Sequence, residues 1–358
     1  MIEINDYKKL SKFNVLSFNS IKKIEKIYSI TKKNNILIYC DLGKRGLNAS
    51  ARMGKTFYKY FKSKGNNISI FVDNYSEKLV FAPKKFNEAA FSLKKNDLLI
   101  LVGSGMTLYF HKKGKRVDKN ILINKLGIKM VSTNGLISLK KEKINVFFKA
   151  FNHDEKKLIK LNKKLVSFFE KSKKAIVSCP KGTNFSVLLG KRRVISNDGS
   201  LKDFSTNYPV GEVYTAPLEN SANGIAFVKS AKVLGKTILL KKPVKMEFQN
   251  GLLVNNDVPN LKKGLKKLEL FNKKKGVKNW RKAPYTIAEF AIGTNSKSKL
   301  IGLMINDEKA FGTIHFAIGA NSHFGGKTKC NGHMDYVIEK PTLFLDNKKL
   351  IDNGKFLI

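Results

Sequence analysis

The sequence predicts an α/β protein with two domains: an N-terminal Rossmann-like α/β domain over residues 1–180, and a strand-rich α+β domain over residues 181–358. Short apolar runs alternate with helix-like stretches in the first half, which is typical of a mostly parallel sheet covered by helices. Strand-like runs with turn signals dominate the second half. A chain of 358 residues is long enough for about two domains, and its 42% hydrophobic content excludes general disorder.

The first half contains four apolar runs that predict buried strands, at residues 36–40, 68–72, 98–102 and 129–133. Residues 48–64 predict a helix between the first two. The segment Ala49–Thr56 resembles a phosphate-binding loop, but it falls inside this helix and not ahead of it, so we expect an ordinary helix. A second, amphipathic helix is expected over residues 153–174, with Leu and Phe on one stripe.

The second half predicts a series of short strands and one helix. The pair Asn250-Gly251 separates two apolar segments, which is a strong signal for a hairpin turn. The helix is expected over residues 259–273. The expected strands lie at 175–179, 193–195, 211–216, 225–228, 237–240 and 244–248.

The chain is strongly basic, with 69 Lys or Arg, 27 Asp or Glu and a formal charge of +42. Only six of the basic residues are arginine, the residue that sites for bases and phosphates prefer, and the lysines are scattered along the whole chain. We therefore expect a solvated lysine surface and no nucleic-acid partner.

The three cysteines are widely spaced, which argues against a disulfide framework. No N-terminal signal and no apolar run of about 20 residues is present, so a cytoplasmic protein without a membrane partner is expected.

Histidine is scarce, with five in the chain, yet three of the five lie between residues 315 and 333. Two segments in this region echo each other, Glu289-Phe-Ala-Ile-Gly-Thr-Asn295 and His315-Phe-Ala-Ile-Gly-Ala-Asn321. As strands, each would present one ligand-type side chain, Glu289 or His315, on a face otherwise lined with small residues. The helix-like stretch 298–308 between them predicts parallel neighbours, which would place Glu289 and His315 side by side.

Further ligand-type residues lie near these strands. His333 and Asp335 are two residues apart and so share one face of a strand. Glu212 lies in an apolar setting and needs a partner, either a lysine or a metal ion shared with Glu289. Glu308 is a further carboxylate. Imidazole and carboxylate together are good ligands for Zn²⁺, Mn²⁺, Co²⁺ or Fe²⁺, so the sequence predicts a strand-rich α+β metal-binding domain.

These motifs resemble the aminopeptidase T type of metallopeptidases. The resemblance covers roughly the last 150 residues, through Gly211–Pro217, Glu289–Asn295, Asp307–Gly319 and His333–Asp335. It implies a two-domain enzyme, usually dimeric, that binds two divalent cations and removes N-terminal residues from peptides. It also implies that six residues are the metal ligands or the acid and base near them: Glu212, Glu289, Glu308, His315, His333 and Asp335.

The chain departs from the family at one position. Members carry a Tyr seven residues after the His that matches His315, whereas this chain has Ser322, followed by His323. The interval between His315 and His333 is also shorter than in those enzymes. Some relatives of this fold use a single Fe²⁺ to open hydroxylated pyridine rings.

The leading hypothesis is a metal-dependent aminopeptidase, a hydrolase that uses a metal-activated water to attack a peptide substrate. Its cofactor would be one or two divalent ions, Zn, Co or Mn, with Fe as a further candidate. Glu289 or Glu308 would act as bridging ligand or base, and His323 or Ser322 would stabilise the oxyanion. The alternatives are an Fe(II)-dependent ring-cleaving dioxygenase on the same scaffold and a basic nucleic-acid-binding protein. A homodimer is expected.

Overall fold

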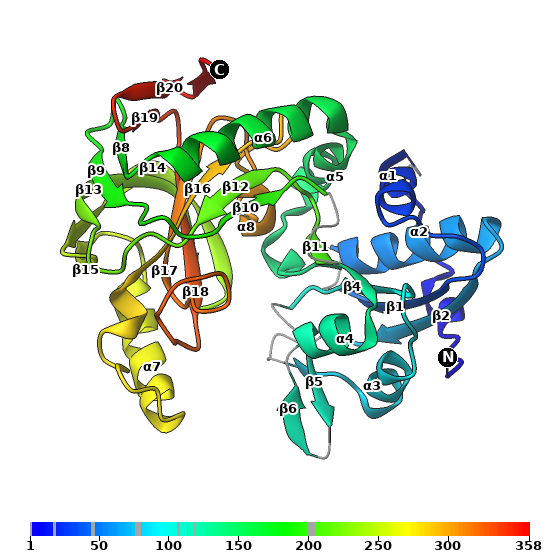
Figure 1. Ribbon diagram of the computed structural model, residues 1–358. Helices are drawn as coiled ribbons and strands as arrows, with labels where there is room; N and C mark the ends of the chain where they lie inside the picture. The colour runs from blue at the N-terminus through cyan, green and yellow to red at the C-terminus, as the bar shows by residue number, and fades with distance from the viewer. Residues whose placement is uncertain are drawn as a thin grey trace. The chain divides into compact units, whose positions relative to one another are not determined.

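The computed structural model describes residues 2–16, 19–43, 47–75, 80–105, 108–112, 114–117, 119–199 and 205–358. They form two compact units (Figure 1). The first unit comprises Met1–Asn152 and Gly199–Val210, and the second comprises His153–Asp198 and Gly211–Ile358. The α/β fold class is as predicted.

The two units divide the chain earlier than the predicted ranges 1–180 and 181–358. The long helix α6 (Glu155–Lys171) and strand β8 (Lys174–Ser178) contribute Phe169 and Val177 to the core of the second unit. Residues 199–210 return to the first unit, where β11 (Ser205–Asn207) pairs with β7 (Lys129–Thr133). Contacts between residues that are far apart in sequence set this division, and a change in composition does not mark it.

The first unit is built on a five-stranded parallel sheet in the order β11-β7-β4-β1-β2. The four expected strands are all present, as β1 (Asn35–Asp41), β2 (Asn67–Asp73), β4 (Leu98–Val102) and β7. A small separate ribbon contains β3 (Val80–Phe81), β5 (Leu108–Lys112) and β6 (Lys115–Val117). Strands β4 and β7 are buried throughout, which explains their continuous apolar runs.

Helices cover both faces of this sheet, with α1 (Asn19–Ile27) and α2 (Ala49–Ser63) on one side and α3 (Lys84–Phe91) and α4 (Lys119–Leu126) on the other (Figure 1). The segment that resembles a phosphate loop lies inside α2, as expected. Its Gly54 has a packing role, because a Cβ there would lie 2.4 Å from Sγ of Cys40 in β1.

The second unit is built on a 13-stranded sheet whose described pairings are all antiparallel. Its strand order is β10-β12-β16-β17-β18-β13-β9-β8-β19-β20-β21, and β14 and β15 extend from β13. Its helices are α6, α7 (Leu261–Lys274) and the short α8 (Met304–Asp307). The remaining strands are β9 (Asn184–Leu188), β10 (Val194–Asn197), β12 (Glu212–Thr215), β13 (Asn223–Val233), β14 (Lys236–Gln249), β15 (Leu252–Asn256), β16 (Ile287–Gly293), β17 (Ile314–Gly319), β18 (His333–Ile338), β19 (Thr342–Leu345), β20 (Lys348–Asp352) and β21 (Lys355–Phe356).

The predicted parallel pairing of the two echoing segments is wrong, because β16 and β17 are antiparallel. The connection between them turns back instead of crossing over: Gly293 N–H donates to the carbonyl of Thr313 at 3.0 Å, so both ends of the connection meet at the same end of the strands. The predicted helix shrinks to the four residues of α8. Glu289 lies opposite Ala317, and His315 lies opposite Ala291, so the two ligand-type residues share one face as diagonal neighbours.

The core of the second unit lies on the opposite face of these strands. Phe290, Ile292, Phe316 and Ile318 alternate with the ligand-type positions and pack into it, as the alternation predicts. The ring of Phe316 lies 5.1 Å from that of Phe185 and 5.4 Å from that of Phe248, centroid to centroid.

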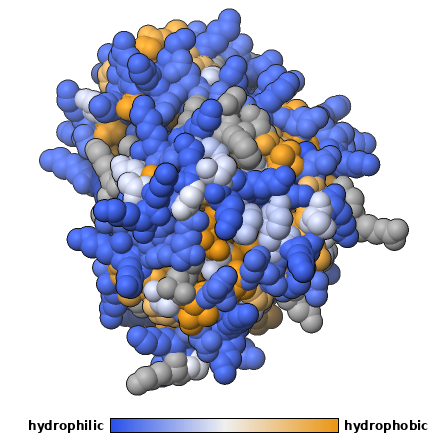
Figure 2. Space-filling model, turned by 90° about the vertical axis from the view of Figure 1, so that its right-hand side faces the viewer, coloured by the Kyte–Doolittle hydropathy of each residue, from blue (hydrophilic) through white to orange (hydrophobic). Residues whose placement is uncertain are grey.

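Hydrophilic side chains cover most of the molecular face in Figure 2, with apolar residues in smaller groups between them. This is the surface that scattered lysines predict. No described helix is both long and apolar enough to span a membrane. Cys40, Cys179 and Cys330 are all free.

Replacing Phe316 by Ala should strongly destabilise the protein, because its side chain is fully buried among three other rings beneath the ligand-type face. We expect a loss of ~3–5 kcal/mol in the free energy of unfolding, measured by denaturant titration of the full chain. The control is Phe271→Ala, whose side chain is 43% exposed on α7 and which should cost about 0.5 kcal/mol or less. Equal losses for the two variants would contradict this account of the core.

Candidate metal centre

Four adjacent strands of the second unit bring five ligand-type side chains to one face of the sheet. Strand β12 carries Glu212, β16 carries Glu289, β17 carries His315, and β18 carries His333 and Asp335. The positions beside them on this face are small, since Gly293 pairs with Glu212 and Gly319 with His333. A Cβ on Gly293 would lie 2.1 Å from the carbonyl oxygen of Ala310, so the approach of the following loop requires glycine there.

His315 lies between two carboxylates at the centre of this face. Its Nε2 is 3.4 Å from Oε2 of Glu212 and 3.3 Å from Oε1 of Glu289. The imidazole is fully buried, and neither of its nitrogens has a hydrogen-bond partner among the described residues. Glu212, Glu289 and His315 therefore form one group whose ligand atoms lie within 4.8 Å of one another.

His333 forms a second group with Glu289 and Asp335, and Glu289 thus belongs to both groups. Nε2 of His333 lies 3.0 Å from Oδ1 of Asp335 and 3.3 Å from Oε2 of Glu289. Its Nδ1 lies 2.7 Å from the carbonyl oxygen of Ala320, to which only a protonated nitrogen can donate. This bond leaves the lone pair of the neutral imidazole on Nε2, facing the carboxylates, which is the arrangement of a metal-binding histidine.

A buried lysine, Lys309, and a half-buried one, Lys232, compensate part of the negative charge. The Lys309 ammonium contacts Oε1 of Glu212 and lies 2.6 Å from Oε1 of Glu308, and its side chain is 1% exposed. The Lys232 ammonium lies 3.1 Å from Oδ2 of Asp335. Such pairs are required because an isolated buried carboxylate is very costly.

The carboxylates of the site differ in their pKa values. Burial raises the pKa of Glu212, but the charges of Lys309 and His315 outweigh it and lower the pKa to about 2. Burial raises the pKa of Glu308 to about 7, because Lys309 only partly offsets it and the negative charges of Glu212 and Asp335 add to it. Glu308 is thus the carboxyl group that can exchange a proton near neutral pH.

The pKa values of the two imidazoles are shifted upward, whereas burial alone would lower them. Burial alone would lower the pKa of His315, but Glu212 and Glu289 raise it to about 10. The pKa of His333 is likewise raised well above its usual value, against burial, by Asp335 and Glu289. Protons on these rings therefore take the place that a cation would otherwise occupy.

The charges of the cluster fit one divalent cation. Four carboxylates, those of Glu212, Glu289, Glu308 and Asp335, face the ammonium groups of Lys232 and Lys309. With neutral imidazoles and with Glu308 ionised, two net negative charges remain, and one divalent ion neutralises them. The buried Nε2 of His315 without a hydrogen-bond partner and the fixed tautomer of His333 are further features that fit a metal ion.

The loop before β17 is held in place by a buried aspartate. Asp307 accepts hydrogen bonds from the backbone N–H groups of Ile301 at 2.8 Å and Gly302 at 3.0 Å and from the hydroxyl of Ser230 at 2.7 Å. Burial raises its pKa to about 6, against these hydrogen bonds. Its neighbours in sequence, Glu308 and Lys309, are thereby positioned at the cluster.

The structure brings five of the seven predicted site residues together and places the other two beside them. Glu308 is outside both ligand groups and is joined to Glu212 through Lys309. His323 is exposed, and its ring centroid lies 6.1 Å from that of His333, at the edge of the cluster. The assignment of metal ligands and of catalytic roles to these residues stays a prediction.

Residue-by-residue reasoning did not find three of the residues at the site. Lys309 and Lys232 are two among many lysines, and only the position of Lys309 directly after Glu308 could have indicated its role. Asn197, whose amide donates to Oε1 of Glu212 at 3.1 Å, lies on β10 and carries no signal in the sequence.

The fold is similar to two solved structures. The 2,5-dihydroxypyridine dioxygenase from Pseudomonas putida KT2440 has a TM-score of 0.65 at 14% identity, covering 96% of this chain and 98% of that one. Wild-type AmpT from Thermus thermophilus has a TM-score of 0.56 at 12% identity, covering 96% of this chain and all of the other. At these identities the likeness concerns the fold. No curated protein matches the chain.

A family profile matches residues 142–358, which include the whole cluster and more than half of the chain. Its description is NicX, 2,5-dihydroxypyridine 5,6-dioxygenase. The expectation of a metallo-aminopeptidase, a protease and hydrolase, is therefore wrong, because the family that matches the chain is one of dioxygenases. The chain belongs to the NicX family of 2,5-dihydroxypyridine 5,6-dioxygenases.

Proposed function

We propose that this protein is an Fe(II)-dependent dioxygenase that opens a hydroxylated pyridine ring. The observation that carries the proposal is the cluster of two histidines and two carboxylates on β16, β17 and β18, in which the carboxylate of Glu289 lies 3.3 Å from Nε2 of both His315 and His333. Histidines combined with a carboxylate are typical of non-haem Fe(II) oxygenases. Membership of the NicX family supports the same reaction class.

Glu289, His333 and Asp335, whose ligand atoms lie within 4.8 Å of one another, would hold the iron, and His315 beside Glu289 would complete the set. When bound, Fe(II) supplies the one-electron chemistry that dioxygen needs to react with a closed-shell ring. The charge balance of the cluster supports one ion over two, because a second divalent ion would leave two uncompensated positive charges in a buried site.

Residues of the chain itself would orient the substrate ring and accept a proton from its hydroxyl group. The residues next to the ligand-type side chains on this face are small, Ala291, Ala317 and Gly319. Glu308, with a pKa of about 7, would accept the proton of a ring hydroxyl, and Lys309 would stabilise the resulting charge on the substrate side of the site. Both atoms of dioxygen enter the product as the bond between ring carbons 5 and 6 breaks.

Protein loaded anaerobically with Fe²⁺ should consume one dioxygen per molecule of 2,5-dihydroxypyridine and form an acyclic product heavier by one dioxygen. An oxygen electrode and mass spectrometry with ¹⁸O₂ measure both. His333→Ala and Asp335→Asn should abolish turnover and lose stoichiometric iron, because each removes a ligand. His111→Ala in the first unit is the matched control and should retain both turnover and stoichiometric iron. An iron-loaded wild type that leaves hydroxylated pyridines intact would contradict the proposal.

Metal binding should become tighter as pH rises. The neutral imidazole binds metal, whereas in the metal-free protein the pKa of His315 is about 10 and that of His333 is also raised. Each displaced proton should increase affinity by about tenfold per pH unit below that pKa. Competition titrations with Zn²⁺ between pH 6.5 and 8.5, and calorimetry in buffers of different ionisation enthalpy, test this. An affinity independent of pH would refute the protonation of the free site.

Glu308→Gln should lower turnover by about a hundredfold or more while leaving bound iron stoichiometric, because the amide cannot accept the hydroxyl proton. Oxygen uptake and elemental analysis on the same sample separate the two effects. Loss of iron from this variant would instead make Glu308 a ligand, and unchanged turnover would exclude it as the base. The exposed Glu339→Gln on the same unit is the control.

A further inference from the structure

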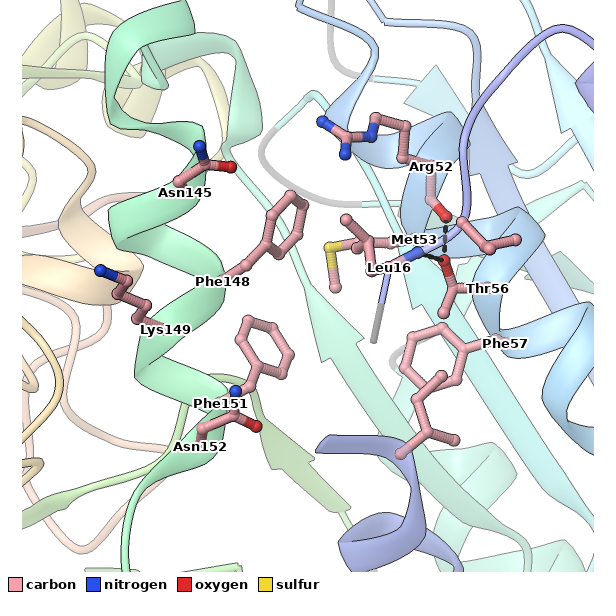
Figure 3. Close-up of a pocket in the computed structure, with 12 residues that line it drawn as sticks. Leu16, Arg52, Met53, Thr56, Phe57, Asn145, Phe148, Lys149, Phe151 and Asn152 are labelled. Atoms are coloured by element: carbon pink, nitrogen blue, oxygen red, sulfur yellow. Dashed lines mark hydrogen bonds between the residues drawn. The ribbon is translucent and has the colours of Figure 1, made fainter. Parts of the chain in front are cut away.

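The first unit contains a cavity of about 480 Å³ that the proposed reaction does not use. Its walls come from the segment before α1, from α2, and from α5 (Ile144–Lys149) with the turn that follows it. Figure 3 shows Phe148 and Phe151 extending from the α5 segment toward Met53 and Phe57 of α2. All residues of the metal cluster belong to the second unit, so this cavity is a separate feature.

The lining is mainly apolar and aromatic. Phe57, Phe148 and Phe151 present three rings, and Met53 adds a thioether. Phe57 and Met53 are each 3% exposed, so these walls are part of the packed unit. A cavity of this size with an apolar, aromatic lining is typical of a small-molecule site, and its rings favour a flat aromatic ligand.

One cation faces this apolar space. The Arg52 guanidinium lies 5.7 Å from the centroid of the Phe148 ring, and its Nε is buried without a hydrogen-bond partner among the described residues. No lining residue is acidic. The other cation of the lining, Lys149, is exposed, and its ammonium is turned to the far side of α5 in Figure 3.

Two further observations single out Arg52. The hydroxyl of Thr56 cannot serve as the anchor, since it already donates to the carbonyl of Arg52 at 2.6 Å and accepts from the N–H of Leu16 at 2.9 Å. Arginine is also rare, six residues in a chain with 69 basic ones. Arg192, by comparison, forms a bidentate pair with Glu219 at 2.9 and 2.6 Å, whereas Arg52 has no such pair among the residues that the structure describes.

We propose that this cavity binds an aromatic monocarboxylate, with the ring among the phenylalanines and the carboxylate on the Arg52 guanidinium. The planar fork of arginine matches a carboxylate through two parallel hydrogen bonds. The buried Nε supplies one donor that has no other partner. The carboxylate of such a ligand neutralises the guanidinium, and its aromatic ring fills the apolar space.

The test uses 2-naphthoate, whose own fluorescence reports binding, and its neutral counterpart 2-naphthamide, both titrated into the full-length wild-type protein. The wild type should bind one naphthoate, about 10- to 100-fold more tightly than naphthamide. Arg52→Met should remove this preference while binding naphthamide unchanged. Arg281→Met, which removes an arginine stacked on Trp280 in the second unit, is the matched control and should bind like the wild type.

His333→Ala should also bind naphthoate like the wild type, because the cavity and the metal cluster are independent. Equal binding of naphthoate and naphthamide to the wild type, or no binding of naphthoate at millimolar concentration, would overturn the proposal, and neither result depends on the folding of a variant. A loss of binding in His333→Ala would place the ligand at the cluster and would also refute it. Dioxygenase activity is not needed for any of these readouts.

Discussion

The buried ion pairs of Lys309 with Glu212 and Glu308 are the constraint on which the second unit depends. Four carboxylates converge on one face of its sheet, and burying them without counter-charges would cost more than the fold could offset. Lys309 and Lys232 supply part of that charge, and the protonated imidazoles or one divalent ion supply the rest. The loop anchored by Asp307 places Lys309 there.

The two faces of the central strands have separate tasks. Phe290, Phe316 and Tyr336 fix the positions of β16, β17 and β18 by packing against the core, and the residues between them carry the ligands. The rigidity of the core face is therefore what holds the ligand atoms within reach of one another. The first unit, a parallel sheet with helices on both faces, has its own cavity, which Arg52 and mainly apolar side chains line, so the chemistry of this cavity differs from that of the metal cluster.

Much of the fold and of the site followed from local patterns. The continuous apolar runs of β4 and β7, the amphipathic stripe of α6 and the hairpin at Asn250-Gly251 depend on residues close in sequence, and each is present. The alternation along β16 and β17 placed Glu289 and His315 correctly on the face opposite Phe290 and Phe316. Local patterns could not predict that β16 and β17 pair antiparallel, because the direction of pairing depends on how residues 294–313 turn back. The homodimer remains a prediction of the sequence.

The sequence by itself determined which side chains are of a type that can bind a metal ion. It also determined that His333 and Asp335 share a face, since strand geometry alone sets a two-residue period. Only the tertiary structure decided that two lysines, out of the many in this chain, enter the cluster, since burial and contact come from strands far apart in sequence. Composition could not separate Lys309 from the solvated lysines, because the two differ only in what surrounds them.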